Sequence, residues 1–129
     1  MTLRARVALR WLPSIAWMGV IFFASSLPAK DVPGDYSVYA HFAEYAILAV
    51  LLFLALRVTR EPGPAALIAL AVASIYGMTD EVHQLFSPGR MADPLDWVTD
   101  TAGAAFGVIV ALRIARSRDV AGARRSDSG

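Results

Sequence analysis

Four long apolar segments constrain this chain more than any other feature of its sequence. They cover residues 7–27, 38–56, 65–86 and 95–115, and each is predominantly apolar despite scattered polar positions. With a rise of about 1.5 Å per residue, such segments form helices about 28 to 33 Å long, which matches a hydrocarbon layer of roughly 30 Å. The sequence therefore predicts an all-α protein with four transmembrane helices.

The distribution of charge argues against the alternative fold, a small soluble helical bundle. Soluble helices carry a charged face opposite their apolar stripe, yet residues 47–56 and 65–75 contain no charged side chain. Charged residues make up 18% of the chain, compared with about 25% in typical soluble domains. The absence of cysteine excludes a disulfide framework and a thiolate metal site.

Basic residues indicate the orientation of the spans, because they remain on the cytoplasmic side of a membrane. With four spans, one side of the membrane receives only Lys30 and Arg90. The other side receives ten arginines, namely Arg4, Arg6, Arg10, Arg57, Arg60, Arg113, Arg116, Arg118, Arg124 and Arg125. This asymmetry predicts a multi-pass protein of the cell membrane with both termini in the cytoplasm.

Short connections rich in proline and glycine join the segments, at residues 33–34, 62–64 and 88–89. Because short connections force neighbouring helices to run antiparallel, we expect an up-down bundle. The predicted transmembrane domain covers residues 7–115, and residues 116–129 form a polar tail without regular structure. The first segment also has the basic start of a cleaved signal peptide, although its full span length and Pro13 favour a retained helix.

Polar residues gather at the ends of three segments that this topology brings to the outer side. The second segment begins with His41, Glu44 and Tyr45, and the third ends with Asp80, Glu81, His83 and Gln84. The fourth begins with Asp96, Thr99 and Asp100. Ionisable groups inside a membrane are costly and face the bundle interior or a wet cavity. The three sets are therefore expected to point at one another near the outer interface.

Helical spacing supports a shared direction for these side chains. The residues at 41, 44 and 45 follow the i, i+3, i+4 pattern of one helix face, and those at 80, 83 and 84 repeat it. Glu81 lies about 100° around the helix from Asp80. Gly103 and Gly107 share a face with Asp100 and form a small-xxx-small pair, which predicts close packing of the fourth helix on a neighbour.

Arg90 follows a tight Pro-Gly turn and is one of two basic residues on the acidic side. Two roles are open for it. The first role is structural, as a salt bridge to Asp93 or Asp96 or a clamp onto Asp80 or Glu81. The second role is ligand binding. A planar bidentate donor suits either use.

The motifs in these segments resemble the VanZ-like family, which is named for a glycopeptide (teicoplanin) resistance protein. The matching stretches are HFAEYAIL from His41, DEVHQLFSPGR from Asp80 and DWVTDTAGAAFG from Asp96, with WMGVIFFASSLP in the first segment. The resemblance implies a small four-helix membrane protein. Two positions depart from the family pattern, because Asp100 replaces an asparagine and Val38 replaces a basic residue. Both changes make this site more acidic than the family norm.

Several functions fit the predicted polar site. Crowded carboxylates beside a histidine at a lipid boundary suit acid-base chemistry, with Asp80 and Glu81 as acid and base, His41 as proton shuttle or ligand, and Arg90 as anion anchor. A divalent metal held by His41 with Glu44, or by Asp80 with His83, is a sharper alternative, but no HExxH spacing is present. No metal or other cofactor is therefore predicted. The remaining alternative is a structural clasp that specifies helix pairing.

Charge excludes some substrate classes. The outer side sums to two positive minus eight negative charges, or −6, from Lys30 and Arg90 against Asp31, Asp35, Glu44, Asp80, Glu81, Asp93, Asp96 and Asp100. Hydrolysis of lipid phosphates requires several cations around the phosphate, so such a surface favours cations or amine-bearing ligands.

Contact with anionic membrane lipid is the simpler explanation for the arginine-rich tail, because the tail lies near a membrane. No nucleic-acid partner is therefore predicted.

The sequence thus predicts a cell-envelope membrane protein that contributes to glycopeptide resistance by altering access to surface targets. Its expected partners are membrane lipid and either a cell-envelope precursor or the glycopeptide itself. The rival hypothesis is an intramembrane enzyme that acts on an envelope lipid or lipid-linked precursor. The candidate site comprises His41, Glu44, Tyr45, Asp80, Glu81, Gln84, Arg90, Asp96 and Asp100.

Overall fold

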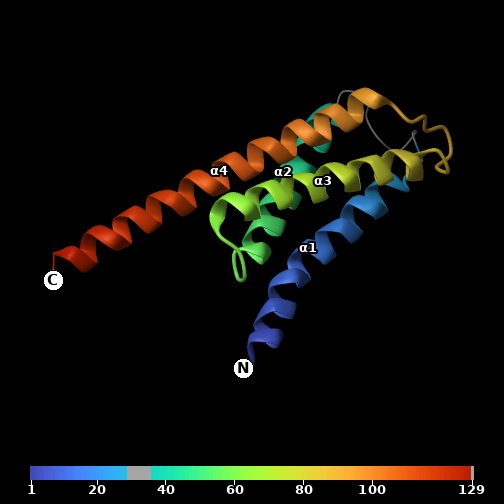
Figure 1. Ribbon diagram of the computed structural model, residues 1–129. Coiled ribbons are helices and arrows are strands. Elements are labelled where there is room, and N and C mark those ends of the chain that lie inside the picture. The colour runs from blue at the N-terminus through green and yellow to red at the C-terminus, as the bar shows by residue number, and fades with distance from the viewer. Residues whose placement is uncertain (29–35, 129) are drawn as a thin grey trace.

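The computed structural model describes residues 1–28 and 36–128, and within them the chain is all helical (Figure 1). The helices are α1 (Leu3–Ser25), α2 (Tyr36–Leu56), α3 (Pro62–Gln84) and α4 (Pro94–Asp127). All four are long and apolar enough to cross a membrane. The predicted fold class is confirmed. Lys30, Asp31 and Asp35, which entered the charge count above, lie outside the described residues.

The helices begin a few residues before the predicted apolar segments because polar residues and prolines start them. The Thr2 side chain accepts a hydrogen bond from the Ala5 N–H at 3.2 Å, and the Asp93 side chain accepts one from the Leu95 N–H at 2.9 Å. Both bonds satisfy backbone donors that a first helical turn leaves free. Helices α3 and α4 also place proline at their first positions, where its missing N–H costs nothing.

Helices α2 and α4 pack backbone against backbone. A Cβ atom added to Gly103 would lie 2.2 Å from the Phe42 carbonyl oxygen, and one added to Gly107 would lie 2.3 Å from that of Ala46. Only glycine fits at these two positions, and the predicted packing role of the pair is confirmed. This contact fixes the second helix beside the fourth at the depth of the polar residues.

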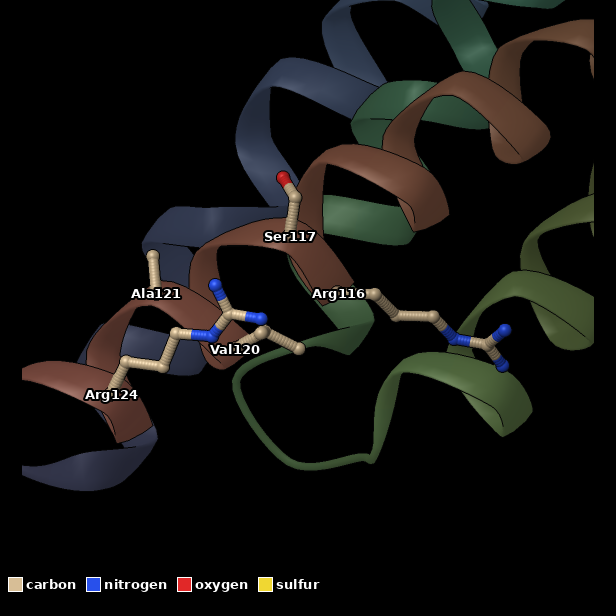
Figure 2. Close-up of a pocket in the computed structure, with 5 residues that line it drawn as sticks. All are labelled: Arg116, Ser117, Val120, Ala121 and Arg124. Atoms are coloured by element: carbon tan, nitrogen blue, oxygen red, sulfur yellow. The ribbon is translucent and has the colours of Figure 1, made fainter. Parts of the chain in front are cut away.

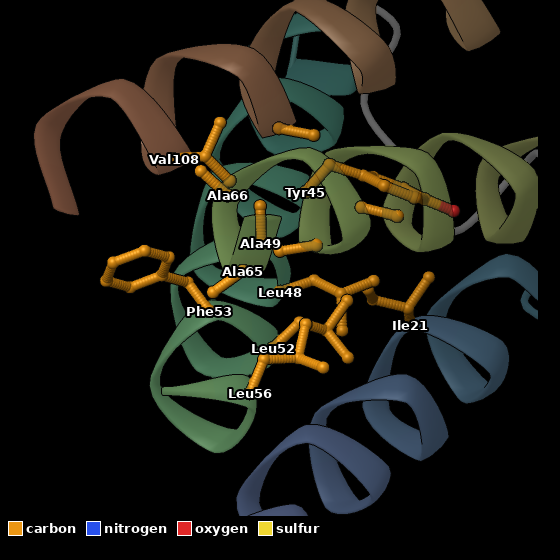
Figure 3. Packing of buried hydrophobic residues seen from close by; sticks show 13 residues of the cluster. Ile21, Tyr45, Leu48, Ala49, Leu52, Phe53, Leu56, Ala65, Ala66 and Val108 are labelled. Atoms are coloured by element: carbon orange, nitrogen blue, oxygen red, sulfur yellow. The ribbon is translucent and has the colours of Figure 1, made fainter. Parts of the chain in front are cut away.

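The apolar core sets large side chains of α2 against small side chains of α3. Leu48 and Leu52 are buried, and so are Ala65, Ala69 and Ala73, which repeat every four residues along one stripe of α3. Figure 3 shows the leucines of α2 between α3 and Ile21 of α1. The alanine stripe lets α3 approach closely, so the polar ends of α2 and α3 lie side by side.

Helix α1 is attached mainly near its C-terminal half. The Tyr76 hydroxyl donates to the Met18 carbonyl at 2.7 Å, and the Trp17 indole N–H donates to the Glu44 carbonyl at 2.9 Å. Towards its N-terminus α1 diverges from the other helices (Figure 1). Its outward side carries exposed apolar residues such as Leu12, as expected for a helix that faces lipid.

The C-terminal segment differs from the prediction of an irregular tail. Helix α4 continues to Asp127 and is 34 residues long, or about 51 Å at 1.5 Å per residue. Residues 116–127 include four arginines and two alanines, which are strong helix formers, and they continue a helix that packing has already nucleated. Asp119 also lies 3.9 Å from the Arg57 guanidinium. The end of α4 therefore extends well beyond the span predicted for residues 95–115.

This extension carries a groove of about 540 Å³ along one stripe of α4. Figure 2 shows the residues that line it, which are Arg116, Ser117, Val120, Ala121 and Arg124. The groove lies at the opposite end of α4 from the polar residues of its first turns.

Candidate functional site

A histidine and two aspartates join α2 to α4 at the end of the bundle with the α3–α4 connection. The His41 Nδ1 atom lies 2.8 Å from Asp100 Oδ1, a hydrogen-bond distance, and its Nε2 atom lies 4.0 Å from Asp96 Oδ2. Asp100 is fully buried, whereas the Asp96 side chain is 21% exposed. The imidazole thus reaches from a deep carboxylate to a shallower one, an arrangement suited to moving a proton between them.

The second carboxylate oxygen of Asp100 faces α3. A Cβ atom added to Gly77 would lie 3.1 Å from Asp100 Oδ2, so the glycine makes room for this carboxylate. The Oδ2 atom is buried and has no hydrogen-bond partner among the described residues. A buried acceptor without a partner is costly, and it therefore marks a place where a ligand, water or proton contributes binding energy.

Three further predicted residues converge on the same region from α2 and α3. Tyr45, Asp80 and Gln84 are all buried. Asp80 interacts electrostatically with His41 and Asp100, and Tyr45 interacts with both aspartates. Within the described part of the chain, the Tyr45 hydroxyl and the Gln84 amide nitrogen have no hydrogen-bond partner. Tyr45 and Asp80 thus lie near the pair of His41 and Asp100, and Gln84 is buried one turn beyond Asp80 on α3.

Glu44 and Glu81 occupy the margins of this cluster. Glu44 is half-buried and interacts electrostatically with His41 and Asp80. Glu81 accepts a hydrogen bond from the Asp93 N–H through Oε2 at 2.8 Å, while its Oε1 is buried without a partner among the described residues. Glu81 therefore ties the end of α3 to the start of α4.

Arg90 holds α1 and forms none of the predicted ion pairs. Its Nε donates to the Leu27 carbonyl at 3.2 Å, and a terminal nitrogen lies 3.5 Å from the Ala24 carbonyl. The Ala24 carbonyl also accepts the Leu27 N–H at 3.2 Å, and the Leu27 carbonyl lies just beyond α1, so the guanidinium supplies donors where the helical hydrogen bonds end. Salt bridges from Arg90 to Asp93, Asp96, Asp80 or Glu81 do not occur among the described residues, because the arginine turns toward α1.

Two residues that the sequence placed beside the site point elsewhere. His83 stacks on Phe22 with ring centroids 4.1 Å apart, and its Nε2 lies 2.8 Å from the Ser26 hydroxyl. Thr99 donates its hydroxyl proton to the Leu95 carbonyl within α4. No group of three or more metal-ligating side chains is found in residues 1–28 and 36–128.

Some residues around the site were missed by the sequence reasoning. The Trp97 indole N–H donates to the Ser74 carbonyl at 3.0 Å, and the Ser87 hydroxyl donates to the Ser25 carbonyl at 2.9 Å. The first bond joins the start of α4 to the middle of α3, and the second joins the α3–α4 connection to the end of α1. The only sequence signal was their position within or beside the polar motifs, because the acceptors are backbone atoms that no pattern marks.

The arrangement of these motifs can be compared with known proteins. The chain matches the VanZ/LLP1 family over residues 10–116, which is most of its length. The chain belongs to the VanZ/LLP1 family. The resemblance drawn from the motifs at His41, Asp80 and Asp96 is thereby confirmed. No curated protein and no solved structure matches the chain. This VanZ/LLP1 protein is thus a multi-pass membrane protein whose buried polar residues lie at one end of its bundle.

Proposed function

We propose that this VanZ/LLP1 protein acts at the cell envelope, where its polar site binds the polar group of an envelope lipid or lipid-linked precursor. Binding there lowers susceptibility to glycopeptides of the teicoplanin type by altering access to their surface targets. The candidate site comprises the nine residues predicted above, except that Arg90 acts by positioning α1.

The observation that carries this proposal is the contact between His41 and Asp100. It joins two helices through a charged or polar pair that is buried in an otherwise apolar bundle, and buried ionic groups are expensive to keep. Among the described residues, Asp100 Oδ2 and the nearby Tyr45 hydroxyl are buried without a hydrogen-bond partner. A clasp that served only to join helices would satisfy its own atoms, whereas a binding site leaves acceptors and donors for its ligand.

A second candidate function is an intramembrane enzyme acting on the same class of lipid. The geometry of His41 favours it, because a carboxylate that holds one imidazole nitrogen fixes the orientation of the other nitrogen. That second nitrogen faces Asp96 at 4.0 Å. In this role His41 is the general base, Asp100 orients it, and Asp96 receives or returns the proton.

The test compares His41 with the chain's other histidine. Full-length His41→Ala and His83→Ala are expressed in a strain that lacks the chromosomal copy, and teicoplanin susceptibility and folded yield are measured for each. We expect His41→Ala to restore susceptibility with normal yield, while His83→Ala, which lies outside the polar cluster, retains the resistance of the wild type.

A third variant separates the remaining alternatives. His41→Gln keeps a side-chain donor toward Asp100 but cannot transfer a proton at neutral pH. Full function in this variant favours binding, whereas lost turnover of a purified envelope lipid with normal yield favours the enzyme. Loss of folded yield in both His41 variants would favour the structural clasp and would contradict the proposed binding site.

We also propose that both termini lie in the cytoplasm, so that the polar site lies at the outer membrane interface. The support is the excess of arginine at the ends of the spans on the side of the termini. Because the chain has no cysteine, single cysteines at positions 4, 90 and 118 can be labelled with an impermeant reagent. We expect labelling of intact cells only at position 90, and labelling at positions 4 and 118 would reverse the orientation.

A further inference from the structure

A shallow, open cavity of about 250 Å³ lies between the end of α3 and the start of α4. Its lining consists of Met78 and Glu81 from α3, Pro94 and Trp97 from α4, and Ala92 from their connection. The volume is below the roughly 300 Å³ at which pockets for drug-sized molecules begin. The cavity therefore suits a small head group better than a whole lipid.

One carboxylate faces this otherwise apolar lining. Glu81 is 8% exposed, and its Oε2 accepts the Asp93 N–H at 2.8 Å. Its Oε1 is buried without a partner in the described part of the chain. One oxygen thus fixes the side chain at the lining, and the negative charge of the carboxylate favours a positively charged ligand in the adjoining pocket.

The surroundings of Glu81 favour a cation over an anion. Its electrostatic neighbours are His41, Asp96 and Asp100, so two of the three are acidic. Arg90 is directed to the carbonyls of α1, and no other arginine or lysine lies at this end of the described residues. An anionic group would meet repulsion in this field, whereas a cation would be attracted.

The aromatic wall points to the kind of cation. The Trp97 indole N–H is held by the Ser74 carbonyl at 3.0 Å, which fixes the ring beside the cavity. Ammonium groups bind to the faces of tryptophan rings, especially where water is excluded. Met78 adds a polarizable side chain that packs against methyl or methylene carbons. A carboxylate, an indole and a thioether together form a site for an organic ammonium group.

We propose that this cavity binds a primary or quaternary ammonium group, with Glu81 as the counter-charge and Trp97 as the aromatic wall. The inference rests on the proposed function and deepens it, because it names the chemical class of the polar group that the protein recognises. A lipid head group and a soluble amine both supply this chemistry.

Choline and its neutral carbon isostere, 3,3-dimethylbutan-1-ol, test the inference. Their dissociation constants are measured by calorimetry with the full chain in phosphatidylglycerol nanodiscs. We expect choline to bind at least about tenfold more tightly than the isostere, because only choline carries the charge. Equal affinity for the two probes would overturn the inference.

Variants locate the binding in this cavity. Glu81→Gln keeps an oxygen for the Asp93 N–H and should weaken choline binding by at least about tenfold, whereas the same change at the exposed Glu61 should have no effect.

Trp97→Phe and Trp97→Leu both lose the bond to Ser74, so the difference between their choline affinities isolates the contribution of the aromatic ring. We expect Trp97→Leu to bind about threefold or more weaker than Trp97→Phe. If Glu81→Gln does not fold, the Trp97 pair decides, and equal choline binding by both variants overturns the inference.

Two further comparisons complete the test. The first identifies the source of the amine, and the second distinguishes failure of this inference from failure of the proposed function. Competition of choline by phosphatidylethanolamine in the nanodisc identifies a lipid head group, and competition by soluble ethanolamine alone identifies a free amine. Weakened choline binding in Glu81→Gln, together with unchanged teicoplanin susceptibility in His41→Ala, would support the cavity and reject the proposed function. Unchanged choline binding in Glu81→Gln with altered susceptibility in His41→Ala would reject the cavity alone.

Discussion

The two ends of α4 carry acidic residues in very different settings. At its start, Asp100 is fully buried and lies 2.8 Å from His41 of α2. Near its end, the Asp119 side chain is 61% exposed and lies 3.9 Å from Arg57. The first pair joins α4 to α2. The second joins α4 to Arg57, which directly follows α2. Burial makes the first pair costly to form and costly to break, whereas water and salt screen the second.

Glycines show the same difference between the two ends. Gly103 lies against the backbone of α2, whereas a Cβ atom added to Gly122 would find nothing within 4 Å. The first half of α4 is therefore determined by its neighbours, and the second half is determined by helix propensity. We expect substitutions to have large effects in the first half and small ones in the second.

The largest effect is expected from Gly103→Ala. The new Cβ atom would lie 2.2 Å from the Phe42 carbonyl oxygen, which forces α2 and α4 apart and lowers the free energy of unfolding by about 3 kcal/mol. Gly122→Ala should raise stability by up to about 1 kcal/mol, because alanine is the better helix former. Denaturant unfolding in mixed micelles measures both, and changes of equal sign would contradict the contrast between the two halves of α4.

The next largest effect is expected at Asp100. Asp100→Leu leaves His41 without its buried partner and should lower the free energy of unfolding by about 3 kcal/mol. Asp100→Asn keeps an oxygen for the imidazole N–H and should cost less than half as much. Asp119→Leu, as the exposed control, should cost below about 1 kcal/mol. Equal losses in the free energy of unfolding for Asp100→Leu and Asp119→Leu would show that the buried pair adds no stability.

A smaller effect is expected at Arg90. Arg90→Met removes the donors to the Leu27 and Ala24 carbonyls and should cost about 1.5 kcal/mol. Amide hydrogen exchange in the last turn of α1 should accelerate, because that turn loses its contact with the α3–α4 connection. Arg118→Met, at an exposed position of the extension, is the control. Unaltered exchange in Arg90→Met would mean that other contacts hold α1.

The smallest effect per residue is expected along the groove of the α4 extension. We propose that Arg116 and Arg124 contact anionic lipid, with each arginine contributing about 1 kcal/mol. The double variant Arg116→Gln, Arg124→Gln should therefore lose stability in phosphatidylglycerol nanodiscs but not in phosphatidylcholine nanodiscs. Salt should reduce the difference. An equal loss in both lipids would indicate a role within the protein.

The parts of the fold that follow from local pattern could be predicted from the sequence. The four apolar segments set the number of helices, and the spacing of residues 41, 44 and 45 placed their side chains on one face. Gly103 and Gly107 indicated close packing before any partner was known. These features depend on residues near one another in the chain, so the sequence shows them directly.

Contacts to backbone atoms could not be predicted in this way. Arg90 was expected to pair with a carboxylate, yet it binds the Ala24 and Leu27 carbonyls, because carbonyls at a helix end accept further donors and carry no sequence signature. His83 has the same spacing from Asp80 as His41 has from Glu44, but it stacks on Phe22. The helical extension through residues 116–127 was also missed, since a packed helix supplied a nucleus that composition alone does not reveal.

The sequence by itself determined the membrane character, the four helices and the family of this protein, because hydropathy and motif spacing are properties of a linear chain. Only the tertiary structure decided which polar groups meet. It paired His41 with Asp100, turned Arg90 toward the end of α1, and left one Glu81 oxygen without a partner among the described residues. Those outcomes depend on the rotation and closeness of the helices, which the small residues of α3 and α4 set by packing.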